Sequence, residues 1–88
     1  MKKLKDSLEQ LHSELQNARE IDPESAEILR KLIGDIENIL ERSGSEREEE
    51  HKNILDGLRE SAQKFELTHP ELAGAIRIVI NSLSNIGA

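Results

Sequence analysis

The apolar residues of this chain recur at steps of four and three positions in four separate segments. This spacing places them on one face of an α-helix and leaves polar residues on the other face. The pattern predicts helices over residues 2–20, 23–42, 46–66 and 70–86. The expected buried positions are Leu4, Leu8, Leu11, Leu15 and Ala18 in the first helix; Ala26, Ile28, Leu29, Leu32, Ile33, Ile36, Ile39 and Leu40 in the second; His51, Leu55, Leu58, Ala62 and Phe65 in the third; and Leu72, Ile76, Val79, Leu83 and Ile86 in the fourth.

The three breaks between these segments carry residues that end and begin helices. Asp22 stands directly before Pro23, and this order is typical of an N-cap followed by the first residue of a helix. Gly44 suits the left-handed conformation that ends many helices. Residues 68–71 are expected to form the last turn together with a capping box. The tight first turn predicts that the first and second helices are antiparallel neighbours.

The two halves of the chain align with each other without a gap. Residues 1–41 share 11 identical positions with residues 48–88, and Pro23 falls on Pro70. An internal duplication explains this register. Two unrelated amphipathic hairpins with the same apolar spacing explain it equally well.

Both explanations predict the same fold class. We expect one all-α domain over residues 1–88, an antiparallel four-helix bundle built from two similar helical hairpins at 1–42 and 46–88. Pairing the hairpins buries the apolar faces that a single hairpin would leave exposed. The alternative is that hairpins of two chains pair with each other, which the break at residues 43–45 permits.

Composition narrows the range of functions. The net charge is -6 and the chain has one aromatic residue, Phe65, which argues against binding to nucleic acid, because phosphates need a cationic face and bases need stacking partners. Cysteine is absent, so thiolate chemistry is excluded. No apolar segment is long enough for a signal peptide or a membrane span. We therefore expect a cytoplasmic protein.

Five short blocks of sequence carry a family resemblance. They are LHSEL at 11–15, DPES at 22–25, L-x-x-L-x-x-D-I at 29–36, F-E-x-x-H-P-x-L-A at 65–73 and LSNIG at 83–87. With these blocks the chain resembles a family of short bacterial proteins, the domain-of-unknown-function family numbered 4404. The resemblance covers nearly the whole chain. It implies a small helical bacterial protein and brings no activity, ligand or catalytic residue.

The most specific enzymatic hypothesis rests on Glu-x-x-His pairs, which occur at 9–12, 48–51 and 66–69. Four-helix proteins with two-metal centres use such pairs, directed into the core. The apolar register places Glu9 in solvent and His12 at the flank, and the last pair spans a turn. Only the pair at 48–51 lies on the row of expected buried positions of its helix. We therefore expect no metal, no cofactor and no catalytic residue, and the metal-dependent enzyme is the least favoured alternative.

The last helix differs from the rest of the chain in its charge. Although 34% of all residues are charged, Arg77 is the only charged residue after Glu71. Removing water from a helix face with so few charges costs little free energy, which favours a protein–protein interface. We expect a non-enzymatic interaction or structural module that binds a second copy or another protein, with no small-molecule substrate; peripheral membrane binding by the same face is an alternative that lacks aromatic anchors. The predicted interface residues are Gly74, Ala75, Ile78, Asn81, Ser82 and Asn85.

Overall fold

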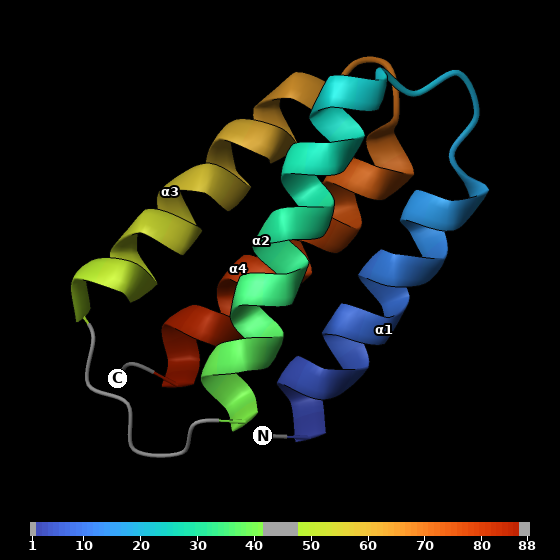
Figure 1. The fold of residues 1–88 in the computed structure, drawn as a ribbon. Coiled ribbons are helices and arrows are strands. Elements are labelled where there is room, and N and C mark those ends of the chain that lie inside the picture. Colours follow the sequence, from blue (N-terminus) through green and yellow to red (C-terminus); the bar gives the residue numbers. More distant parts are fainter. Residues whose placement is uncertain (1, 42–47, 87–88) are drawn as a thin grey trace.

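The computed structural model describes residues 2–41 and 48–86, and places the side chains of residues 3–38 and 52–84. Within these ranges the fold is all-α, as expected. The helices run alternately up and down, so that consecutive helices are antiparallel (Figure 1). They are α1 (Lys2–Asn17), α2 (Pro23–Glu41), α3 (Glu48–Phe65) and α4 (Pro70–Ile86).

The starts of the helices follow the predicted signals. Pro23 and Pro70 are the first residues of α2 and α4. Asp22 caps α2, because its Oδ2 accepts hydrogen bonds from the backbone N–H and the hydroxyl of Ser25, at 3.1 and 2.9 Å. The hydroxyl bond first, and then the backbone bond, lower the pKa of the Asp22 carboxyl below its ordinary value of 3.8. The equivalence of the two prolines is thus confirmed.

Helix α4 is the most extensively packed element of the bundle. It makes its main contacts with α3 and α1, whereas α2 packs mainly against α3 (Figure 1). Helices α1 and α2 are antiparallel, as predicted, but the prediction that they are neighbours needs correction, because α1 makes its main contacts with α4 rather than with α2. The physical reason lies in side-chain size: α4 buries Ala73, Ala75 and Ser82, and small side chains let neighbouring helix backbones approach closely.

The core contains most of the predicted positions, although Ala18, Leu32 and Leu55 are only half-buried and Ile28 is exposed. In α3, Ile54 is fully buried and Leu55 only half-buried, because α3 contacts both α4 and α2 and its buried arc is wider than one seam. In α2, Ile28 is 47% exposed. This helix has one main neighbour, so the edge of its wide apolar stripe stays in solvent. The predicted core positions Ile39, Leu40, His51 and Ile86 lie outside the described side chains.

The two hairpins share their helix starts and differ in their packing. Helices α3 and α4 pack along each other, whereas α1 and α2 are joined less closely. Contacts between α1 and α4 connect the two hairpins within one chain. The predicted break at residues 43–45 lies outside the described residues. None of the helices, as far as the structure describes them, combines the length and apolar character needed to cross a membrane.

Candidate functional site

The outward side of α4 carries a narrow stripe of mostly uncharged residues. Ile78 is 52% exposed, which confirms its predicted outward position. Glu71 and Asn81 are also exposed, and Gly74 is half-buried. These four residues follow one another at steps of three, four and three, so they lie in one row along the helix. We call this row, Glu71, Gly74, Ile78 and Asn81, the outer stripe.

Two of the predicted interface residues do not belong to this surface. Ala75 is 4% exposed and Ser82 is 9% exposed, because α4 packs against two neighbours and its buried face is wider than a single seam. The Oγ of Ser82 lies 3.1 Å from the Oγ of Ser7 on α1. Since the Ser7 hydroxyl donates to the carbonyl of Lys3 at 2.7 Å, Ser82 donates to Ser7. The side chain of Asn85 lies outside the described residues.

The one basic residue of α4 is already paired. Nη2 of Arg77 lies 2.6 Å from Oε1 of Glu66, which follows α3. Both side chains are about half exposed, so the pair stabilises the fold little by itself. Its effect is on the surface, where the guanidinium beside the outer stripe already has a partner.

Gly74 leaves an open recess one helical turn before Ile78. A Cβ atom at Gly74 would have no heavy atom within 4 Å. A Cβ at Gly57 in α3 would instead stand 3.0 Å from Cδ2 of Leu32, so that glycine serves the approach of α2 to α3. The outer stripe therefore presents the exposed side chain of Ile78 one turn from a position that has no side chain.

His69 connects the two turns at one end of the bundle. Its Nε2 lies 2.7 Å from the carbonyl oxygen of Arg19, and because a carbonyl only accepts, Nε2 carries the proton. Nδ1 of the same ring lies 3.0 Å from the Thr68 hydroxyl. The ring stands edge-on to Phe65, with centroids 5.7 Å apart. The predicted capping box at residues 68–71 needs correction, because α4 starts at Pro70 and the carbonyl of His69 accepts from the N–H of Ala73 at 3.0 Å, so that His69 rather than Thr68 occupies the N-cap position.

The hydroxyl, imidazole and carbonyl around His69 form a chain like that of a nucleophilic hydrolase, with one difference. The group behind the imidazole is the neutral carbonyl of Arg19, whereas hydrolases place a carboxylate there to stabilise the imidazolium. The bonds link the turn after α3 to the segment after α1.

Among the described residues, hollows lie at two places beside these helices. One of about 340 Å³ lies between the end of α1 and the start of α4, where it is lined by Glu14, His69 and Glu71 among others. A smaller one of about 160 Å³ lies between α2 and α3 beside Ile28 and Lys64. The larger volume is near the lower limit of small-molecule sites. The residues that line it are mainly polar, and Ala18, Pro70 and Leu72 add apolar surface.

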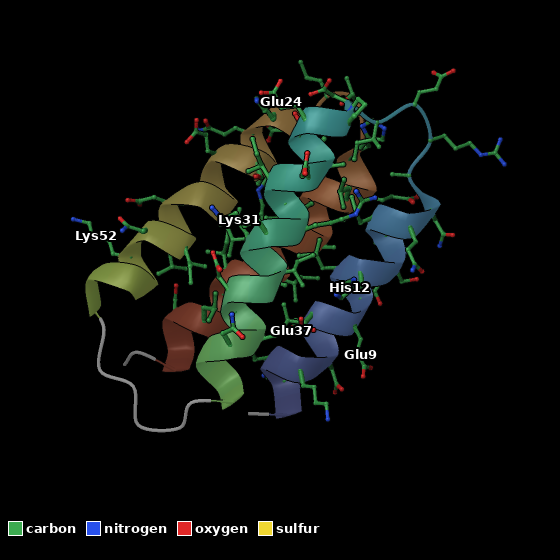
Figure 2. The ribbon with its side chains drawn as sticks, viewed as in Figure 1. Glu9, His12, Glu24, Lys31, Glu37 and Lys52 are labelled. Carbon is green, nitrogen blue, oxygen red and sulfur yellow. The ribbon has the colours of Figure 1, made fainter. Side chains whose placement is uncertain are left out.

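The two Glu-x-x-His pairs whose side chains the structure describes, at 9–12 and 66–69, do not converge. Figure 2 shows Glu9 and His12 on α1 and Glu37 on α2, and Nε2 of His12 lies 3.9 Å from Oε2 of Glu37. Residues 66 and 69 are engaged in separate bonds, and the side chains of residues 48–51 are not described. Over the described part of the chain, no three His, Cys, Asp or Glu side chains gather in a way that could hold a metal ion.

Comparison with protein families identifies one family for this chain. The model of a family described as a domain of unknown function, DUF4404, matches residues 4–88. The chain belongs to the DUF4404 family. No curated protein and no solved structure matches it. The predicted family resemblance is thereby confirmed, and the membership assigns no site, so the candidate site of this DUF4404 protein rests on its surface geometry.

Sequence reasoning missed two features of this DUF4404 chain. Glu71 belongs to the outer stripe, and its position three residues before Gly74 was a signal for it. The bond from His69 to Arg19 had no signal, since the two residues are 50 positions apart and local patterns do not report such contacts.

Proposed function

We propose that this protein is a non-enzymatic interaction module whose binding surface is the outer stripe of α4. The observation that carries the proposal is Ile78, which is 52% exposed in the middle of the stripe. Full burial of an isoleucine side chain contributes ~1.5–3 kcal/mol. Covering the half that is still exposed therefore contributes about 1 kcal/mol to binding, without any rearrangement of the bundle.

Charge favours α4 over the other helices as the binding surface. The exposed side of α1 carries Lys5, Asp6 and Glu9, and that of α3 carries Lys52 and other ionic residues. Covering those sides would remove many charges from water, which is costly unless each finds a partner. On α4 the charges are Glu71 at the first turn and Arg77, which is already paired with Glu66.

Ile28 on α2 is the nearest competitor and provides a control. It is 47% exposed, almost as much as Ile78. Its surroundings differ, because Glu24 and Lys31 lie one turn away on the same helix and Lys64 lines the adjoining hollow (Figure 2). A partner at Ile28 would therefore have to match several charges.

The experiment compares three proteins: the wild type, Ile78→Glu and Ile28→Glu. Each is used as bait at equal concentration, and all bound chains are quantified, including further copies of the bait. We expect the wild type and Ile28→Glu to retain the same bound chains and Ile78→Glu to lose them. Circular dichroism checks that all three have the same helicity. Equal binding by the two glutamate variants would refute the proposed surface.

A further inference from the structure

We infer that the partner on the outer stripe is a second copy of this chain, with the two α4 helices packed antiparallel about a two-fold axis at the level of Ile76. This inference rests on the proposed function and adds the identity and orientation of the partner. The spacing of the stripe is its starting point. Its steps of three, four and three are the spacing of the positions that face each other in a pair of coiled-coil helices.

Shape complementarity supports self-association. An axis at the level of Ile76 places Ile78 of each copy opposite Gly74 of the other. Ile78 projects into solvent, and the position of a Cβ at Gly74 is open for at least 4 Å. A projecting side chain thus meets an empty recess twice, once on each side of the axis. A two-fold interface needs a surface that complements itself in this way.

Charge selects the antiparallel orientation. In the same register Glu71 lies opposite Asn81 of the second copy, and a carboxylate accepts hydrogen bonds from a side-chain amide. A parallel pair would instead place the two Glu71 carboxylates side by side, with Ile78 against Ile78 and each recess empty. Like charges at facing positions are destabilising. The order of residues along the stripe is therefore complementary to a second stripe that runs in the opposite direction, and not to one that runs in the same direction.

The flanks of the stripe allow this contact. Arg77 keeps its bond of 2.6 Å to Glu66, so the dimer buries no unpaired cation. The helix has 17 residues and is about 25 Å long. One helix pair of this length covers less surface than the ~800 Å² per partner of a standard interface. We therefore expect a dissociation constant in the micromolar range rather than a permanent dimer.

The first test fills the recess. Gly74→Gln places a long side chain where Ile78 of the second copy would insert, and Gly34→Gln makes the same change on α2, where a Cβ also has open space. Sedimentation equilibrium up to about millimolar concentration gives the dissociation constants. We expect dimerisation of the wild type and of Gly34→Gln, with at least tenfold weaker dimerisation of Gly74→Gln. A monomeric wild type, or equal dimerisation of the two variants, would overturn the inference.

The second test determines the relative orientation of the two α4 helices. Because the chain has no cysteine, disulfides can form only between introduced cysteines. Glu71→Cys and Asn81→Cys proteins, one of them mass-labelled, are mixed in equal amounts and oxidised. In the antiparallel dimer like positions are separated by about 15 Å along the helix, too far for a disulfide. Mixed disulfides should therefore dominate. Like disulfides, or the statistical distribution of random collisions, would contradict the antiparallel register.

These results separate the inference from the proposed function. If the wild type is monomeric and Ile78→Glu loses the bound proteins, the outer stripe is an interaction surface but its partner is not a second copy. If Ile78→Glu loses neither self-association nor the bound proteins, both the inference and the proposed function are refuted.

Discussion

Glycines in the middle of helices allow the closeness of helix packing to be tested one methyl group at a time. Gly34 and Gly57 both lie inside helices, and alanine is favoured over glycine there by ~0.5–1 kcal/mol. At Gly34 a Cβ has open space, so Gly34→Ala should stabilise the protein by that full amount. At Gly57 the Cβ would stand 3.0 Å from Cδ2 and 3.3 Å from Cδ1 of Leu32.

The contact at Gly57 is closer than an ordinary van der Waals contact, and it decides the outcome. Leu32 is half-buried, so its side chain can shift, at ~0.5–1.5 kcal/mol for a departure from its preferred rotamer. This strain offsets the gain in helix propensity, and Gly57→Ala should change stability by less than ~0.5 kcal/mol. In a Leu32→Ala background the strain is absent, and Gly57→Ala should recover the full gain, which is a measurable coupling.

Urea unfolding followed by circular dichroism measures all these variants, at concentrations low enough to avoid self-association. A gain of 1 kcal/mol corresponds to about 5 °C in Tm for a protein of this size. If Gly57→Ala stabilised as much as Gly34→Ala in the wild-type background, the close approach of α2 to α3 at Leu32 would be wrong.

Three further predictions test the core, the buried hydroxyls and the helix cap. Leu29→Ala should lower the free energy of unfolding by ~2–5 kcal/mol and Ile28→Ala by less than ~1 kcal/mol, since Leu29 is fully buried and Ile28 is 47% exposed; equal losses in urea unfolding would contradict the placement of α2. Ser7→Ala should destabilise more than Ser82→Ala, by ~1 kcal/mol, because it removes the acceptor of the Ser82 hydroxyl; the reverse order would show that the proton lies on Ser7. Asp22 has a lowered pKa in the folded state, so its stabilisation is full above about pH 3.8 and is lost as pH falls through the folded-state value. The advantage in Tm of the wild type over Asp22→Asn should therefore vanish in acid, and a pH-independent difference would count against the charged cap.

Local signals predicted the elements of this fold well. Proline and a capping carboxylate at the start of α2 act within a few residues of each other, so their roles follow from the sequence. The periodic apolar positions predicted the four helices for the same reason. Ile78 was correctly predicted to be exposed, because the apolar residues that recur at steps of four and three in α4 define a buried side that does not include position 78.

Contacts between helices were predicted less well, because the row of apolar residues shows which side of a helix is buried but not which neighbouring helix covers that side. The neutral side chains Ala75 and Ser82 were assigned to an outer face, yet their small size serves close packing between α4 and its two neighbours. The exposure of Ile28 has the same origin, since it depends on how many helices α2 touches. The bond between His69 and Arg19 joins two turns and requires the folded chain.

The most direct test of the interaction surface is the amide spectrum of the wild type, recorded by NMR over a range from low micromolar to about millimolar concentration. The antiparallel dimer predicts concentration-dependent shifts at Glu71, Gly74, Ile78 and Asn81, with the amides of α2 unchanged. Shifts centred on Ile28, or a spectrum that does not change with concentration, would contradict self-association through the outer stripe.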